Sequence, residues 1–128
     1  MRLILLVGTG SFIGGVCRYL ISGFVQSKSS SIFPFGTLAV NLVGCLLIGI
    51  LYGILEKTDM STGWRLLMVT GILGGFTTFS AFSIETLNLL KTGHAGWGFL
   101  YMLLSVAGGV SLSFLGAWII KTSIQGGT

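Results

Sequence analysis

The chain has 128 residues, of which 52% are hydrophobic and 8% are charged, and its mean hydropathy is +0.96. A soluble domain carries roughly 25% charged residues, so this composition excludes an ordinary soluble protein and predicts an integral membrane protein. In such a protein the placement of the net charge of +4 matters more than its size, and we expect membrane lipid as a partner and no nucleic acid.

Four apolar blocks follow one another along the chain. Each is at or above the roughly 20 residues that an α-helix needs to cross the hydrocarbon. The blocks cover residues 3–25, 36–55, 66–90 and 97–120. The sequence therefore predicts an all-α membrane protein whose residues 1–128 form a single transmembrane domain of four transmembrane helices.

The first block contains one charged residue, Arg18, fifteen residues after the block begins. An unpaired charge at the centre of a membrane helix costs about 2.5 to 3.5 kcal/mol on insertion scales, so this side chain needs a partner or a route to water. Two interpretations remain open: the arginine snorkels and helps to dock the loop after the first helix, or it lines the vestibule of an anion path.

The second block contains a polar face. Thr37, Asn41 and Cys45 are spaced by one helical turn, so they lie on one side of the predicted helix. A buried amide in lipid usually holds helices together through hydrogen bonds. The alternative is that the NH₂ group of Asn41 donates to a passing anion.

The third block contains the run GGFTTFSAFS, residues 74–83, where two adjacent glycines and four hydroxyl side chains interrupt an apolar segment. Irregular backbone at membrane depth is tolerated only where protein or a water-filled path surrounds it. We expect the third helix to be broken within residues 74–80, at Gly74 and Gly75, with carbonyl oxygens freed there. Carbonyls from two copies of the chain would then surround one monovalent cation.

The same run places aromatic rings beside hydroxyl groups. Phenylalanines recur every three residues and form one stripe that includes Phe79 and Phe82, and Ser80 and Ser83 form a second stripe beside it. Such a stripe is ordinarily packing, but phenyl rings have positive edges that contact a small anion without trapping it. Glu85, the one acid well inside a block, is either a proton or cation site or a fixed structural acid paired to hydroxyls or a cation.

In the fourth block Tyr101 and Ser105 are one turn apart and extend the polar stripe. The basic residues are divided almost evenly between the two sides of a four-helix protein, so the positive-inside rule gives little instruction on orientation. One side has Arg2, Lys57, Arg65 and Lys121, and the other has Lys28, Lys91 and a snorkelling Arg18. We therefore expect both orientations and an antiparallel homodimer, because four helices alone hardly enclose a conduction path.

These features resemble the Fluc or CrcB family of fluoride channels. The resemblance spans nearly the whole chain: the glycine-rich first helix with Arg18, the stretch GTLAVNLVG with Asn41, and GGFTTFS followed by Glu85. It implies a dual-topology homodimer in the bacterial inner membrane that passively exports fluoride, with a central sodium ion as its structural cofactor. By the same resemblance Asn41, Phe79 and Phe82 line the fluoride path.

The resemblance also implies that the backbone carbonyls of Gly74 and Thr77 from both subunits hold the sodium ion. We include Thr37, Ser80, Ser83, Tyr101, Ser105, Glu85 and Arg18 as further candidates for the fluoride path. The chain departs from the family at Ala81, where members commonly carry Thr or Ser, and this removes a hydroxyl that is a possible ligand or helix-break bond.

Two other classes of protein share some of these features. A small multidrug exporter is also a four-helix dual-topology dimer, but its proton exchange needs a glutamate in the first helix, where this chain has Arg18 and no acid. A passive assembly subunit would use its glycines for packing alone. An enzyme is not expected, because no nucleophile, base and orienting acid occur together at membrane depth.

Overall fold

The computed structural model describes residues 1–125, and every regular element in that range is helical. Four helical segments are long and apolar enough to cross a membrane, which confirms the predicted all-α class and the four spans. They begin and end within a few residues of the predicted blocks. The elements are α1 (Arg2–Ser27), α2 (Phe35–Leu55), α3 (Thr62–Arg65), η1 (Leu66–Leu73), α4 (Gly74–Phe76), α5 (Phe79–Lys91), α6 (Ala95–Leu103), η2 (Leu104–Gly108) and α7 (Gly109–Gln125).

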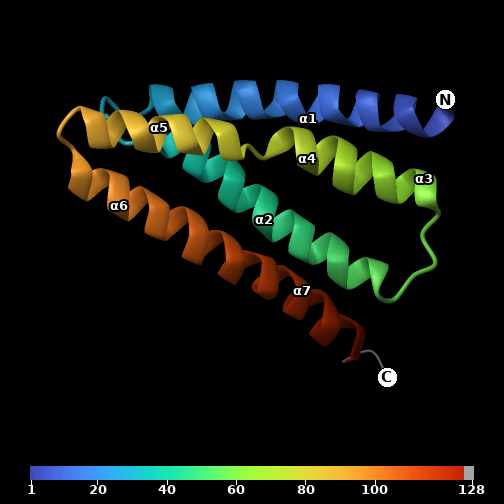
Figure 1. The fold of residues 1–128 in the computed structure, drawn as a ribbon. Coiled ribbons are helices and arrows are strands. Elements are labelled where there is room, and N and C mark those ends of the chain that lie inside the picture. Colours follow the sequence, from blue (N-terminus) through green and yellow to red (C-terminus); the bar gives the residue numbers. More distant parts are fainter. Residues whose placement is uncertain (126–128) are drawn as a thin grey trace.

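The four spans alternate in direction, so the N-terminus, the loop between α2 and α3 and the end of α7 lie at one end of the molecule (Figure 1). The third span runs through α3, η1, α4 and α5, and the fourth through α6, η2 and α7. Packing is closest between α2 and α7 and between α1 and η1 with α4. The third span therefore lies against α1 along its first half.

Glycines permit these close approaches. A Cβ atom on Gly75 would lie 2.5 Å from the carbonyl oxygen of Ser11 on α1, and one on Gly14 would meet the carbonyl oxygen of Ile72. A Cβ on Gly49 of α2 would likewise meet the carbonyl of Ser113 on α7. Membrane helices depend on such small residues, because lipid supplies no hydrophobic drive for helices to associate.

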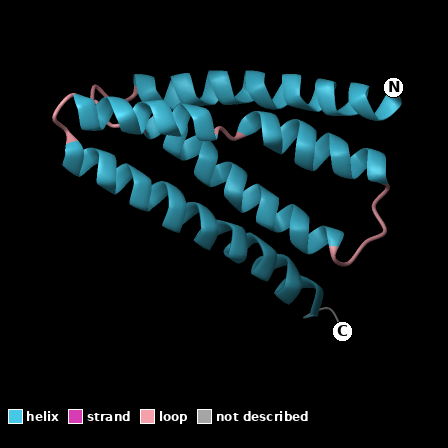
Figure 2. Cartoon of the chain, viewed as in Figure 1, coloured by secondary structure: helices cyan, strands magenta, loops and turns pink. Residues whose placement is uncertain are grey.

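The third span is interrupted inside the predicted range 74–80, but at Thr77 and Thr78 rather than at the two glycines (Figure 2). Gly74 keeps helical dihedral angles of −63° and −35°, whereas Thr77 and Thr78 are extended, with ψ of 152° and 117°. The expectation that the helix breaks at Gly74 and Gly75 is therefore wrong. Position 75 has no room for a larger side chain, because α1 packs directly against it.

Candidate functional site

Asn41 of α2 lies beside the break and bonds to its backbone. The Oδ1 atom of Asn41 accepts from the N–H of Thr78 at 2.8 Å, and Nδ2 donates to the carbonyl oxygen of Thr78 at 3.0 Å. One side chain thus satisfies both polar groups of an extended residue that has left its helix. Because a side-chain amide has two donor hydrogens, one N–H of Asn41 remains for another acceptor.

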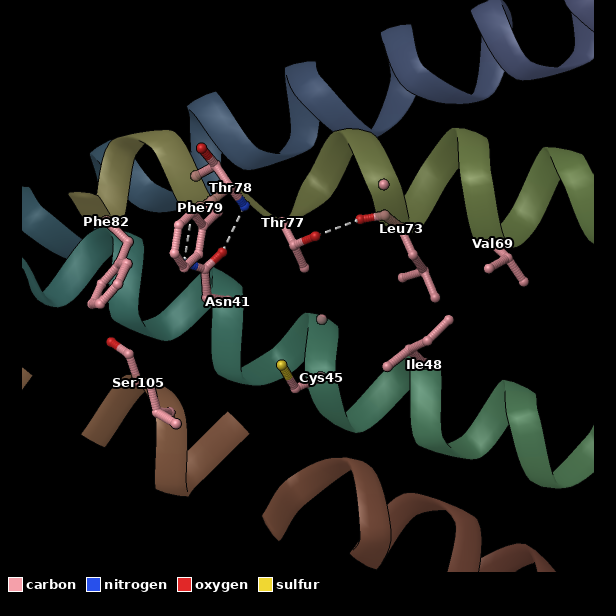
Figure 3. Close-up of a pocket in the computed structure, with 13 residues that line it drawn as sticks. Asn41, Cys45, Ile48, Val69, Leu73, Thr77, Thr78, Phe79, Phe82 and Ser105 are labelled. Carbon is pink, nitrogen blue, oxygen red and sulfur yellow. Dashed lines mark hydrogen bonds between the residues drawn. The ribbon is translucent and has the colours of Figure 1, made fainter. Parts of the chain in front are cut away.

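A cavity of about 390 Å³, which we call the central cavity, opens beside this pairing (Figure 3). Its walls include Asn41 from α2, Phe79 and Phe82 from α5, and Ser105 from η2. The rings of Phe79 and Phe82 lie 5.4 Å apart between centroids, tilted by 49°. Phe79 is 78% exposed, so the cavity is not closed on that side by this copy of the chain.

Ser105 is exceptional among the hydroxyls of the described residues. Its Oγ is the one buried side-chain polar atom in that part of the chain that has no hydrogen-bond partner. Many hydroxyls in the helices or directly after them donate to the carbonyl four residues earlier, as do those of Thr9, Thr77, Ser83, Thr86, Thr92, Ser113, Thr122 and Ser123. Ser105 lies in η2, a π-helical segment whose wider turn displaces the carbonyls from that position. In Figure 3 its hydroxyl points toward Phe82.

A carboxylate cluster lies next to the central cavity, on the side of the loop between α1 and α2. Glu85 accepts from the hydroxyl of Thr37 at 2.6 Å and from the hydroxyl of Tyr101 at 2.7 Å, so each carboxylate oxygen receives one bond. Tyr101 is fully buried and its ring lies 5.1 Å from that of Phe82. The structure thus pairs Glu85 with hydroxyls, as one of the two interpretations expected.

A second cavity of about 300 Å³, the loop-side cavity, reaches this cluster from outside. Its lining includes Thr37 and Glu85 together with Ser22 and Gln26 from the last turns of α1. The cluster of Thr37, Glu85 and Tyr101 thus borders the loop-side cavity through Thr37 and Glu85, and it contacts Phe82 of the central cavity through Tyr101.

Besides Tyr101, which binds Glu85, three of the candidate residues line neither the central nor the loop-side cavity. Ser83 donates to the carbonyl of Phe79 at 2.9 Å, and Ser80 shares a bond of 3.3 Å with the hydroxyl of Thr78. Arg18 donates from Nε to the carbonyl oxygen of Gly75 at 3.1 Å. The structure thus places Arg18 against the helix preceding the break.

The two carbonyls expected to hold a cation have a suitable chemistry. Gly74 and Thr77 both line the central cavity, and within residues 1–125 no hydrogen bond reaches either carbonyl oxygen. The N–H of Thr78, which a continuous helix would direct to Gly74, is bound by Asn41 instead. Unpaired carbonyl oxygens are the ligands that hard cations prefer, so these residues fit a sodium ion.

Two residues important for this geometry were missed in the sequence. Thr78 caps α5, because its Oγ1 accepts from the N–H of Ala81 at 3.2 Å. A threonine placed three residues before that amide, directly before a helix, is a recognisable N-cap signal. Gly44 faces the break from α2, and a Cβ on it would meet the side chain of Thr77. Its spacing of three from Asn41 puts it on the same helix face.

Comparison with known proteins gives one consistent result. The sequence model of the family described as CrcB-like protein, Camphor Resistance (CrcB), matches residues 5–117. A protein of Methylobacillus flagellatus named fluoride-specific ion channel FluC is 42% identical over 127 residues, which cover 98% of this chain and 99% of that protein. Proteins of the same name from Leptospira interrogans and Phocaeicola vulgatus are 41% and 40% identical, covering 92% and 93% of this chain and 94% and 98% of theirs.

Proposed function

This chain belongs to the CrcB-like protein family, and on that premise we propose that it is a fluoride-selective ion channel of the bacterial inner membrane. It carries fluoride passively down its gradient and so lowers the fluoride concentration in the cytoplasm. Hydrogen fluoride enters cells as a neutral weak acid and dissociates inside, which gives an outward gradient of the anion. The protein is a channel rather than an enzyme.

The observation that carries the proposal is the free hydroxyl of Ser105 in a cavity walled by phenylalanine rings. A hydroxyl has one hydrogen, and Thr37, Tyr101 and Ser83 already donate theirs to Glu85 or to a backbone carbonyl. The central cavity therefore offers fluoride at least two donors, the hydroxyl of Ser105 and the second N–H of Asn41.

The rings of Phe79 and Phe82 complete the path. The positive edges of aromatic rings attract an anion weakly, without the full charge that would hold it in place. Conduction needs contacts that are favourable enough for entry and weak enough for release. A narrow path whose hydrogen-bond donors and ring edges replace the water around the ion would favour the smaller anion, fluoride, over chloride.

Glu85 contributes indirectly in this mechanism. Its carboxylate holds the hydroxyls of Thr37 and Tyr101 through short, charge-assisted bonds. These bonds fix the ring of Tyr101 against Phe82, which in turn fixes the position of that ring edge. The same two bonds disperse the negative charge beside the path.

Sodium is proposed as a structural cofactor held by the carbonyls of Gly74 and Thr77. When bound, it supplies positive charge that offsets carbonyl oxygens without hydrogen bonds. Hard cations are surrounded by several oxygen ligands, and one copy of the chain supplies only two. An antiparallel second copy brings the same two carbonyls to a shared axis, and this supports the proposed dual-topology homodimer.

Exposure of Phe79 also supports a dimer, because a second copy would cover the open side of the central cavity. The multidrug-type exporter is not supported: α1, Arg2–Ser27, has no acid to exchange protons. The relatives named FluC give no support to that alternative either.

The proposal is tested by measuring anion efflux from liposomes that contain the purified protein. We expect fluoride to leave the vesicles after a potassium ionophore releases the opposing voltage, while chloride stays inside. Protein-free liposomes are the control. Chloride that leaves as readily as fluoride, or no flux from vesicles shown to hold folded protein, contradicts the proposal.

A further inference from the structure

We propose that Arg18 is a positioning residue that holds the carbonyl end of the first half of the broken helix, rather than a side chain that attracts fluoride. Its Nε–H donates to the carbonyl oxygen of Gly75 at 3.1 Å, across 57 positions of sequence. Gly75 lies in α4, which ends at Phe76, one residue before the break.

The carbonyl of Gly75 needs a donor because the helix stops there. In a continuous helix it would accept from the N–H four residues later, at Phe79, but Phe79 begins the new helix α5 after the extended pair Thr77 and Thr78. An unsatisfied backbone carbonyl at membrane depth costs several kcal/mol. Arg18 supplies the missing donor from the neighbouring helix.

A positive charge suits this position for a second reason. The C-terminal end of a helix carries partial negative charge, and basic side chains bind its last carbonyls. The acids of the chain do not compete for the guanidinium: Glu85 is bound by two hydroxyls, and Glu56 and Asp59 lie in or beside the loop between α2 and α3. A partly buried arginine in a membrane span thus has a backbone carbonyl as its protein partner.

Close packing of α1 against the third span allows Nε of Arg18 to reach the carbonyl of Gly75. Gly14, one turn before Arg18, touches the backbone at Ile72, and Gly75 touches Ser11. These contacts bring the backbones of α1 and α4 near enough for Nε, close to the stem of the side chain, to meet the carbonyl. The close contacts at the glycines and the hydrogen bond from Arg18 together fix α4 against α1.

The carbonyl groups at the break fall into two sets with different surroundings. The oxygen of Gly75 is bound toward α1, while those of Gly74 and Thr77 border the central cavity without hydrogen bonds. Without the bond to Arg18, we expect the end of α4 to change its orientation, so that the carbonyls of Gly74 and Thr77 no longer hold their positions. The effect of this change on sodium binding rests on the proposed function. The bond itself is a property of the fold.

Hydrogen–deuterium exchange of the protein in lipid nanodiscs tests the inference. We expect Arg18→Gln to speed amide exchange in residues 74–82 by roughly tenfold or more, because a charged hydrogen bond at the break is lost. Lys28→Gln is the matched control: it removes the same charge from the end of the same helix, where Lys28 lies over the ring of Phe24, and should leave exchange at the break unchanged.

Fluoride efflux measured on the same variants separates this inference from the channel function. If Arg18→Gln reduces efflux while exchange at residues 74–82 keeps its wild-type rate, and Arg18→Lys restores efflux, then Arg18 attracts the anion and the inference is overturned. If exchange at the break rises although wild-type vesicles pass no fluoride, the inference stands and the channel proposal fails. Should Arg18→Gln not fold, Arg18→Lys keeps the charge and is expected to show the same local rise.

Discussion

Hydroxyl groups in the described helices differ in their hydrogen-bond partners. A hydroxyl bound to another helix stabilises the fold, whereas a buried hydroxyl without a partner is available to bind an ion. Ser113 of α7 bonds the carbonyl of Cys45 on α2 at 3.0 Å as well as its own helix. Ser105 has no partner although its oxygen is buried. A buried group without a partner lowers stability, and the hydroxyl of Ser105 is free for a contact that the described residues of one copy do not supply.

We predict opposite effects for Ser105→Ala and Ser113→Ala. Ser113→Ala loses an interhelical bond, and its free energy of unfolding should fall by about 0.6 to 1.7 kcal/mol, the range for membrane proteins. Ser105→Ala loses no bond within the described residues, so its stability should be unchanged or higher, while fluoride efflux falls by about tenfold. Unfolding in mixed detergent micelles and liposome efflux measure the two quantities. Unaltered efflux in Ser105→Ala would falsify the assignment of this hydroxyl as a fluoride donor.

Among the elements, the interrupted third span depends on its neighbours. α4 is held by α1 through glycine contacts, and the extended residue Thr78 is held by Asn41 of α2. A break in the membrane is tolerated because two other helices bind part of its exposed backbone, the carbonyl of Gly75 and both polar groups of Thr78. The contribution of each glycine of α1 to stability therefore depends on whether it lies on the face that contacts the third span.

Neighbouring glycines of α1 give a prediction with an internal control. A Cβ on Gly14 would meet the backbone at Ile72, whereas one on Gly15 would meet nothing within 4 Å. We expect Gly14→Ala to force α1 away from α4 and to lower the free energy of unfolding by roughly 1 to 3 kcal/mol, as overpacking does. Gly15→Ala should be neutral or slightly stabilising, because alanine favours the helix. Equal effects of the two substitutions on unfolding would contradict the packing argument.

At the scale of the whole molecule, the placement of Arg18 changes the charge balance. Arg18 lies nine residues before the end of α1, about 14 Å along the helix axis, and binds Gly75 instead of reaching the loop. Four basic residues then lie at the end of the molecule that holds the N-terminus and the end of α7, and two lie at the other end: Arg2, Lys57, Arg65 and Lys121 against Lys28 and Lys91. The charge argument for two orientations is thus weaker than the sequence indicated, and dual topology rests on the family resemblance.

Labelling of single cysteines tests the orientation. With Cys17 and Cys45 replaced, a cysteine placed at residue 2 is exposed to a membrane-impermeant thiol reagent outside intact cells. We predict that about half of the molecules react before the cells are opened and the rest react afterwards, as a pair of opposite orientations requires. Labelling confined to one side would exclude the antiparallel homodimer.

The sequence by itself determined the four spans and the residue types of the site, because the bilayer demands long apolar helices and makes every polar group within them conspicuous. It identified Asn41, Phe79, Phe82 and Ser105, which the fold brings to one cavity. The spans needed only local composition, and helical spacing drew attention to these residues, but their assignment to a fluoride path came from the family resemblance.

Only the tertiary structure decided which polar groups are paired and which are free. The bonds from Asn41 to Thr78, from Thr37 to Glu85 and from Arg18 to Gly75 join residues 37, 48 and 57 positions apart. Local sequence does not encode such partners, because they depend on how the helices pack. For the same reason the break lies at Thr77 and Thr78, where Asn41 binds the backbone of Thr78, and not at the glycines that α1 contacts.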